Sequence, residues 1–309
     1  MKISGFSYVR NGFTYQYPFL AAIQSVLPLC HEFVIAVGDS TDGTREAIEA
    51  LGDPRIRIID TVWDETMRQN GKIFALQANT ALRECTGDWV FHIQADEVIH
   101  ERDLPTIKKA IANVDKRPEI EGLLFDFLNF YGSYDYLNNT RKQHKKEIRV
   151  FRNHLNAYAY RDSQGFRRYK SYKSYLQGEK GKKLVVNYVP VPVHHYSYVR
   201  PPEQMYLKGA FFATFYGHST DTSTDIVEEI APKTHDYYNI FRVKRFQGTH
   251  PAVMKSWVEQ GNYDFDPRQI HYKLSVKERL VYFIEDRLKH RFGEWKNYRL
   301  RQSVQVTDL

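Results

Sequence analysis

The amino-acid sequence predicts an α/β protein: a mostly parallel sheet flanked by helices, followed by a helical C-terminal region. Three observations predict this class. Up to residue 131, short apolar runs typical of buried strands alternate with segments whose apolar residues recur at helical spacing. Polar loops follow several of the strands, and no internal repeat or low-complexity linker interrupts the pattern. Strands that alternate with helices form a parallel sheet with helices on both faces.

Each element of the first half is predicted from its own pattern. Pro18 and Pro105 suit the first turn of a helix, Asp42 suits an N-cap, and Thr86-Gly87 suits a helix end. Apolar, β-branched runs predict the strands. The expected strands are Lys2–Tyr8, Phe33–Val37, Ile56–Thr61, Trp89–Ile93 and Gly122–Phe130, and the expected helices are Phe19–Leu27, Thr44–Ala50, Lys72–Glu84 and Leu104–Val114.

The second half has a different pattern. A polar, basic and Tyr-rich stretch contains short strand candidates at Glu147–Arg152 and Leu184–Val189. From Pro201 onward the pattern is helical, with candidates at Glu203–Tyr216, Thr224–Glu229 and Val276–Phe292. We therefore expect a nucleotide-binding and catalytic α/β domain over residues 1–200, with a helical region over residues 201–309 packed on it.

The last of these helices carries an apolar stripe, while most of its basic side chains lie elsewhere. Such a helix can lie on an anionic membrane, but packing against the protein core is the more common use, and we expect packing. The apolar stripe consists of Val276, Leu280, Phe283, Ile284, Leu288 and Phe292.

Composition excludes several classes. The two cysteines, Cys30 and Cys85, form no Cys-x-x-Cys pair, so a zinc site or a redox motif has no support. No apolar segment typical of a signal peptide begins the sequence, and no apolar run is long enough to span a membrane. A cytoplasmic location follows as the expectation.

The positive charge is regional. The net charge is +7, but Arg141–Lys183 contains 14 Lys and Arg against 3 acids, a local net of +11, which leaves −4 for the rest of the chain. A basic stretch of this kind attracts phosphates, acidic glycans, nucleic acid or anionic lipid.

Polar residues follow three predicted strands, in Ser7–Asn11, Gly38–Thr44 and Gln94–Glu97. Ligands bind at the carboxyl ends of strands in open parallel sheets. Asp96 and Glu97 directly follow a buried strand, where carboxylates suit a divalent cation that neutralises a diphosphate; alternatively, Asp96 caps a turn and Glu97 is solvated. Dinucleotide-binding and P-loop glycine motifs do not occur.

Taken as a set, three segments resemble the N-terminal signature of family 2 glycosyltransferases over roughly the first 100 residues. No single segment is specific for this family, but the order and spacing of the three segments together are. The segments are VIAVGDSTDGT (Val34–Thr44), Gly71-Lys72 with the later Asn79, and GDWVFHIQADE (Gly87–Glu97).

The resemblance implies an A-type glycosyltransferase fold with a Rossmann-like sheet, a nucleoside-diphosphate sugar as donor (with uridine as the expected base) and Mn²⁺ or Mg²⁺ as cofactor. Asp96 matches the metal-binding last residue of the family's Asp-x-Asp motif. Nucleoside contacts are expected at Tyr8 and Asp39, and a donor contact at Lys72.

Two positions depart from the family pattern. Gln94 stands in place of the first Asp of the motif, so the metal site is expected to be weaker or to use Glu97. The loop after the second strand has Val37-Gly38 where many relatives carry an earlier Asp, so the nucleoside-binding role passes to Asp39 or is absent.

The segments Glu147–Asn153 and Tyr160–Phe166 resemble the region in which inverting relatives place a catalytic acid. Asp162 is the best match for the base that deprotonates the acceptor hydroxyl, and Glu179 is second. Alternatively, Asp162 pairs with Arg161 or Arg167.

Another family-like element, VPVHHYSYV, contains two neighbouring histidines, of which an extended strand can turn only one toward the site. His194 is our candidate to complete the metal shell, with His195 as the alternative.

These observations predict an inverting, metal-dependent transfer of a sugar to a glycan, a lipid-linked or another anionic acceptor, with peripheral association at the inner face of the membrane. A nucleotidyltransferase of a related fold is one alternative. The other is a nucleic-acid-binding protein that uses the basic stretch 141–183, but no RNA- or DNA-binding motif occurs, so a nucleic-acid partner is not expected.

Overall fold

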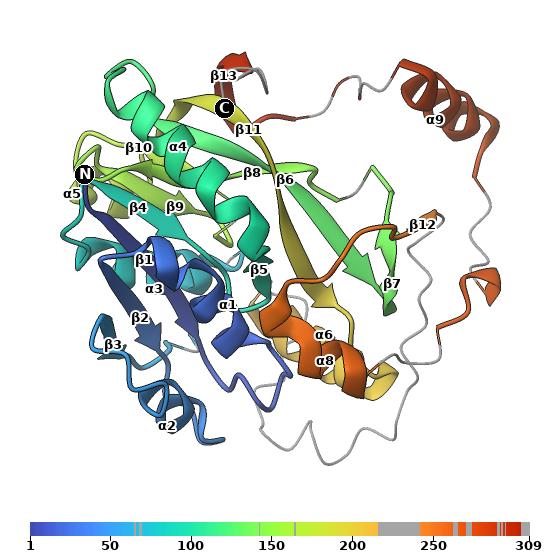
Figure 1. Ribbon diagram of the computed structural model, residues 1–309, viewed down its shortest axis with the longest axis horizontal. Coiled ribbons are helices and arrows are strands. Elements are labelled where there is room, and N and C mark those ends of the chain that lie inside the picture. Colours follow the sequence, from blue (N-terminus) through green and yellow to red (C-terminus); the bar gives the residue numbers. More distant parts are fainter. Residues whose placement is uncertain are drawn as a thin grey trace.

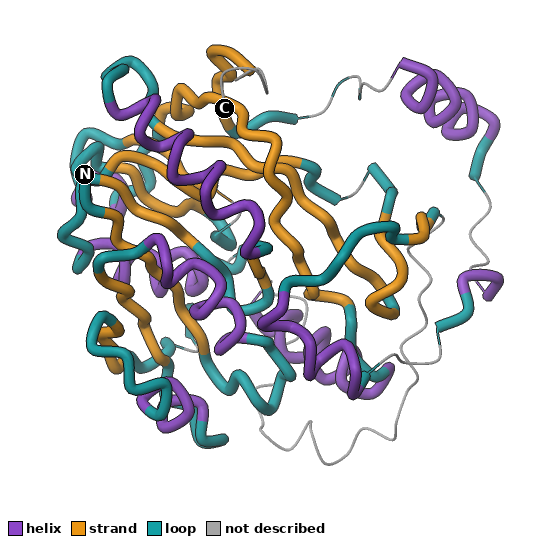
Figure 2. The backbone as a smooth tube through the Cα atoms, viewed as in Figure 1, coloured by secondary structure: helices purple, strands orange, loops and turns teal. Residues whose placement is uncertain are grey.

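One large sheet forms the centre of the computed structural model, and helices cover both of its faces (Figures 1 and 2). The structure describes residues 1–64, 66–67, 70–141, 143–163, 165–215, 242–261, 265–269, 274–288, 291, 293 and 295–303. The main path of the sheet runs β3-β2-β1-β4-β8-β6-β11-β10-β9. Its strands are β1 (Ile3–Val9), β2 (Glu32–Val37), β3 (Ile56–Asp60), β4 (Trp89–His92), β6 (Gly122–Tyr131), β8 (Lys146–Arg152), β9 (Ala157–Tyr160), β10 (Gly165–Arg168) and β11 (Lys182–Tyr198).

The sheet has a parallel core. Strand β1 pairs in parallel with β2 and β4, and β2 pairs in parallel with β3. Strand β8 is antiparallel to both β4 and β6 and joins this half to the parallel pair of β6 and β11. The predicted α/β class and its largely parallel core are confirmed. Shorter strands extend the margins: β5 (Glu97–Ile99), β7 (Ser133–Asn138), β12 (Val243–Arg245) and β13 (Tyr298–Ser303).

Successive side chains of the central strands enter two separate apolar cores, because side chains of a strand alternate between its faces. In β2, Phe33 and Ile35 pack with α1 and α4 on one face, whereas Val34 and Ala36 pack with α3 on the other. The helices are α1 (Phe19–Val26), α2 (Thr44–Glu49), α3 (Lys72–Arg83), α4 (Leu104–Asp115), α5 (Tyr172–Leu176), α6 (Pro202–Phe215), α8 (Lys255–Gln260) and α9 (Val276–Leu288).

The elements of the first half lie within one or two residues of their predicted bounds, whereas the second half differs more. Strand β11 is far longer than the predicted strand Leu184–Val189, because it continues through the two histidines. Strands β5, β7, β9 and β10 and helix α5 were not predicted. The predicted helix Thr224–Glu229 lies outside the described residues.

The region after residue 200 is not purely helical, since β12 pairs with β7, and β13 lies parallel to β11 in the main sheet. A division of the chain at residue 200 remains a prediction. Among the described helices, none has the length and apolar character that crossing a bilayer requires.

Helix α9 lies at the margin of the molecule (Figure 1). The expectation that its apolar stripe packs on the core is wrong for the described side chains. Val276 is 84% exposed, Phe283 69% and Leu288 59%, whereas Tyr282 and Glu285 are the buried residues of the helix. Phe292 lies outside the described residues.

Candidate functional site

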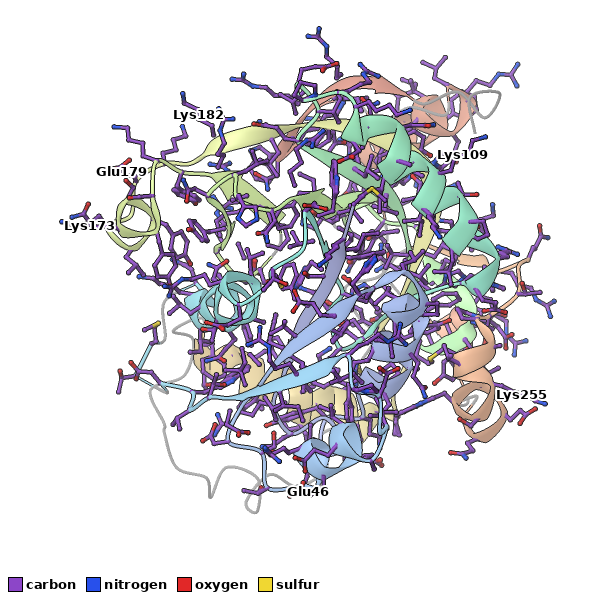
Figure 3. All side chains as sticks on the ribbon, turned by 60° about the vertical axis from the view of Figure 1, so that its left-hand side comes forward. Glu46, Lys109, Lys173, Glu179, Lys182 and Lys255 are labelled. Atoms are coloured by element: carbon purple, nitrogen blue, oxygen red, sulfur yellow. The ribbon has the colours of Figure 1, made fainter. Side chains whose placement is uncertain are left out.

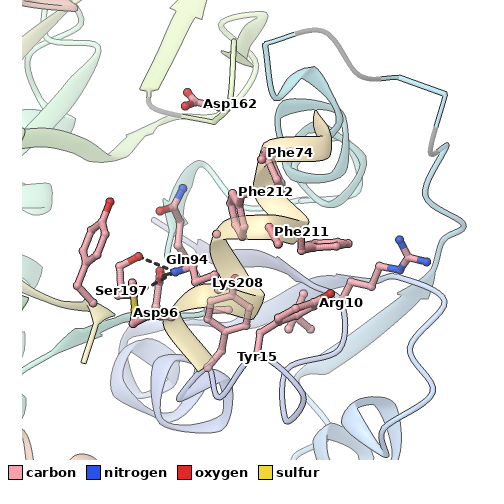
Figure 4. A pocket seen from close by; sticks show the side chains of 18 of the residues that line it. Arg10, Tyr15, Phe74, Gln94, Asp96, Asp162, Ser197, Lys208, Phe211 and Phe212 are labelled. Atoms are coloured by element: carbon pink, nitrogen blue, oxygen red, sulfur yellow. Dashed lines mark hydrogen bonds and ion pairs between the residues drawn. The ribbon is translucent and has the colours of Figure 1, made fainter. Parts of the chain in front are cut away.

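A cavity of about 640 Å³ opens at the carboxyl ends of β1 and β4 (Figure 4). Tyr8 and Arg10 come from the end of β1, and Gln94 and Asp96 from the segment after β4. The end of β11 and one side of α6 complete the wall. The predicted convergence of strand ends therefore produces a cavity large enough for a sugar nucleotide.

Asp96 lies in the wall of this cavity and is only 8% exposed. Burial alone would raise the pKa of its carboxyl, but the nearby basic side chains of His195, Lys208 and Arg200 outweigh burial and hold the pKa at about 2. Asp96 is therefore a carboxylate at any physiological pH, fixed at a strand end.

His195, and not His194, faces Asp96. The register of β11 against β6 places His195 opposite Asn129, whose Oδ1 is 2.8 Å from Nδ1 of His195. With the proton on Nδ1, the lone pair of Nε2 lies 3.7 Å from Oδ1 of Asp96. Burial lowers the pKa of His195 despite the opposing effect of Asp96, which favours the neutral ring.

His194 projects from the other face of β11. It is fully buried, and its ring lies near those of Phe130, His100 and Tyr196, outside the cavity wall. The geometry therefore does not support the prediction of His194 as a metal ligand and favours His195, the alternative.

Glu97 is engaged in a buried ion pair. Its two oxygens accept from Arg149, Oε1 from Nη2 at 2.5 Å and Oε2 from Nε at 2.7 Å, and both side chains are almost completely buried. Oε2 also accepts from the backbone N–H of Gln94. Glu97 does not line the cavity. This geometry favours a structural role for Glu97, which binds the segment before Asp96, over the predicted role as a metal ligand.

Gln94 connects this segment to the turn that carries Asp162. Its side-chain amide donates to the carbonyl oxygen of Ser163 at 3.4 Å, a bond that a carboxylate at this position could not donate. Asp162 lies in the turn between β9 and β10 and lines the cavity. Figure 4 shows it across the cavity from Asp96.

The backbone of this turn is strained on both sides of Asp162. Arg161 has a φ of 56° and Ser163 a φ of 65°, which side chains other than glycine rarely adopt. The structure therefore places Asp162, the predicted base, in the cavity between two residues with positive φ.

The other acidic candidate, Glu179, does not line the cavity. It is exposed, and Figure 3 shows it at the surface near Lys173 and Lys182. The geometry therefore favours Asp162 over Glu179.

At the end of the cavity near β1, Arg10 and Trp63 line the wall. Asp39 does not line the cavity but contacts both residues. Oδ1 of Asp39 lies 3.0 Å from Nε of Arg10 and accepts from the backbone N–H of Trp63. Gly38 permits this arrangement, because a Cβ there would lie 2.6 Å from the Trp63 indole nitrogen and 2.9 Å from Arg10.

Of the predicted donor contacts at this end, Tyr8 lines the cavity, whereas Asp39 and Lys72 do not. Burial raises the pKa of Tyr8 well above its ordinary value, so its hydroxyl stays protonated. Lys72 is exposed at the first turn of α3.

Helix α6 provides a wall that the sequence did not indicate as part of a site. Phe211 stacks on Tyr15 with ring centroids 4.7 Å apart, and Phe212 stacks on Phe74 at 4.9 Å. From the same helix, Lys208 points toward Asp96 (Figure 4). Burial, with Arg200 nearby, lowers the pKa of Lys208 to about 7 against the opposing effect of Asp96.

Residues 18–173 match the family model described as glycosyl transferase family 2. No curated protein matches the chain.

Solved structures similar to this chain include TarS 1–349 of S. aureus, with 16% identity, a TM-score of 0.39, and coverage of 70% of this chain and 65% of TarS 1–349, which is less than two thirds. The mannosyltransferase PcManGT of Pyrobaculum calidifontis, in complex with GDP-Man and Mn²⁺, is 18% identical over 50% of this chain and 45% of its own, with a TM-score of 0.34.

A third similar structure is glucosyl-3-phosphoglycerate synthase of Mycobacterium tuberculosis, at 19% identity and a TM-score of 0.29, over 42% of this chain and 44% of its own.

The family match extends over half of the chain and includes the segment of Asp96 and the turn of Asp162. The expected A-type fold is confirmed, and glycosyl transfer is favoured over the nucleotidyltransferase and nucleic-acid-binding alternatives. The chain belongs to glycosyl transferase family 2.

Proposed function

We propose that the cavity binds a nucleoside-diphosphate sugar and that the enzyme transfers the sugar with inversion to an acceptor hydroxyl. The observation that carries this proposal is the placement of Asp96 and Asp162 in one cavity at the strand ends of a family 2 fold. The nucleoside lies at the Arg10 and Trp63 end, with uridine as the expected base, and the diphosphate lies beside Asp96.

The residues around Asp96 fit a divalent cation, Mn²⁺ or Mg²⁺. The carboxylate of Asp96 and the Nε2 lone pair of His195 face each other across 3.7 Å, an arrangement of two acceptors that a shared cation would satisfy. Asn129 orients the ring through Nδ1, as a metal-binding histidine requires. Two protein ligands leave further positions for diphosphate oxygens, which is the usual arrangement for Mg²⁺. When bound, the cation would neutralise charge on the leaving diphosphate.

The transfer itself requires a base, and we assign that role to Asp162. Its carboxylate accepts the proton of the acceptor hydroxyl while the hydroxyl oxygen bonds to the anomeric carbon. The bond from that carbon to the diphosphate breaks, and the nucleoside diphosphate leaves with the electron pair. The turn between β9 and β10, to which Gln94 is hydrogen-bonded, holds the carboxylate in place.

The acceptor, we propose, is presented at an anionic membrane surface as a lipid-linked or phosphorylated glycan. Helix α9 exposes an apolar stripe, and Lys277, Arg279 and Arg287 supply positive charge on the same helix. A basic helix with an exposed apolar face suits the interface of an anionic bilayer. Tyr282 and Glu285 connect α9 to Arg141, at the start of the basic stretch.

Two experiments test these proposals. A thermal-shift panel of nucleoside diphosphates with Mn²⁺ should raise the unfolding temperature for one base, since a ligand at 100 times its dissociation constant adds about 2.7 kcal/mol. The absence of a shift with any of these nucleotides would contradict the donor site.

In co-sedimentation, the protein should pellet with anionic vesicles but not with neutral ones, and salt should release it. Pelleting with neither kind of vesicle, or equally with both kinds, would contradict the membrane proposal.

A further inference from the structure

Helix α6 contributes a buried cation that the proposed transfer does not use. Lys208 is 8% exposed, and its ammonium donates to Oγ of Ser197 at 2.7 Å and to the carbonyl oxygen of Ser197 at 3.2 Å. Oδ2 of Asp96 is 3.5 Å away. Lys208 also lines the cavity.

The hydrogen bonds of this ammonium are incomplete. An ammonium has three N–H donors, and Ser197 accepts from two of them. The contact with Asp96 is longer than the 2.7–2.9 Å usual for a charged pair. One donor of Lys208 is thus weakly satisfied beside the carboxylate where the donor diphosphate is expected.

The surroundings hold the ammonium in position. The rings of Tyr17, Tyr198 and Phe212 lie 5.0, 5.9 and 5.4 Å from Nζ, distances at which aromatic rings attract a cation. A buried side chain with fixed contacts loses little freedom when it binds a ligand, which favours affinity.

The local charge favours an anion. Among the described residues, Asp96 is the one carboxylate paired with Lys208, and Asp96 also faces His195. Arg200, fully buried and close to Asp96, adds a second cationic group. One carboxylate against two cations leaves this part of the site positive before any ligand binds, which suits a diphosphate and opposes a free divalent cation.

We propose that Lys208 binds the diphosphate of the donor. In the unloaded protein it is the counterion of Asp96, and it donates to a diphosphate oxygen once the donor is bound, with or without a divalent cation. This role rests on the proposed donor site. It predicts two effects of opposite sign, since Lys208 attracts the diphosphate and repels a cation at Asp96.

The test uses Lys208→Met, which keeps the length of the side chain and removes the charge. Calorimetric titration with the nucleoside diphosphate should show affinity weaker by about 10-fold or more, both in EDTA and with Mn²⁺, the scale of a hydrogen bond to a charged group. Titration with Mn²⁺ alone, followed by the electron paramagnetic resonance of the free ion, should show metal affinity stronger by about 3-fold. Lys208→Arg should retain most of the nucleotide affinity.

Lys255→Met is the matched control, because Lys255 lies on the surface in α8 (Figure 3), and it should change neither affinity. Thermal unfolding verifies that each variant is folded, and Lys208→Gln replaces Lys208→Met if that variant unfolds. If the wild type binds the nucleotide and neither Lys208→Met nor Lys208→Gln binds it more weakly, the role of Lys208 alone is overturned. Weaker Mn²⁺ binding by a folded Lys208 variant has the same consequence. Failure of the wild type to bind any nucleoside diphosphate with Mn²⁺ overturns the donor site as well.

Discussion

The cationic side chains of this protein fall into two regions that differ in burial and in partners. Around Asp96, Lys208 and Arg200 are buried and face one carboxylate. The basic stretch Arg141–Lys183 contains many more cations, but five of them pair with acids from other parts of the chain. These pairs are Arg141 with Glu285, Lys146 with Asp126, Arg149 with Glu97, Arg152 with Asp115, and Arg168 with Glu121.

The comparison shows that charge counted along the sequence is not charge presented in space. Ion pairs with acids from other parts of the chain neutralise part of the local net charge of +11. The stretch therefore presents less positive charge to an anionic partner than its composition suggests. Two buried cations can outweigh many exposed ones, because charge interactions are stronger in the interior and weakly screened by salt.

Breaking the buried ion pair of the basic stretch should have the largest effect. Arg149→Met would leave the carboxylate of Glu97 buried without its partner, which typically costs about 3–5 kcal/mol of stability. Urea denaturation measures the loss. The matched control is Arg45→Met, since the exposed pair of Arg45 with Asp60 should contribute little to stability. Equal losses in the two variants would contradict the distinction between buried and exposed charge.

Asp162→Asn should lower kcat by about 100-fold or more, the usual scale of general base catalysis, because the amide cannot accept the proton of the acceptor. Affinity for the nucleoside diphosphate should stay within about 2-fold, since the base acts on the acceptor. Glu179→Gln is the control and should be as active as the wild type. Near-normal turnover of Asp162→Asn would remove the base assignment.

Gln94→Glu tests whether position 94 orients the turn of Asp162. A carboxylate cannot donate to the carbonyl oxygen of Ser163, so kcat should fall by about 5- to 10-fold, the scale of one hydrogen bond. Binding of Mn²⁺ should be unchanged or tighter, because a negative charge is added near Asp96. A lower kcat that is explained by weaker metal binding would show that Gln94 serves the metal and not the turn.

Lys182→Gln should have the smallest effect. Lys182 is exposed at the start of β11, and one basic residue near an anionic bilayer contributes about 1 kcal/mol, or about 5-fold in vesicle binding. Donor affinity should not change. A loss of donor affinity with no change in vesicle binding would reverse the roles assigned to the two cationic regions.

The sequence predicted the parallel half of the fold well, because β1, β2 and β4 are buried on both faces and are rich in apolar residues. Trp89–His92 is the plainest case. The strands β9 and β10 were missed because they are four residues long and their sequences, AYAY and GFRR, show no alternation of apolar and polar side chains.

The site could be predicted only in part. Asp96 and Asp162 follow from the family pattern, but the choice between His194 and His195 depends on the register of β11 against β6. Lys208 could not be found from the sequence, since it is one lysine on a helix and its role comes from the approach of α6 to Asp96, 112 residues away along the chain. Contacts of this kind are set by tertiary packing.

The most direct test of the proposed metal and donor site is calorimetric binding of the nucleoside diphosphate to wild type and Asp96→Asn, with Mn²⁺ and in EDTA. We expect that Mn²⁺ strengthens binding to the wild type, that Asp96→Asn loses this strengthening, and that both proteins unfold at similar temperatures. Strengthening by Mn²⁺ that is equal in wild type and Asp96→Asn would contradict the proposed site, because the cation and the diphosphate would then bind elsewhere.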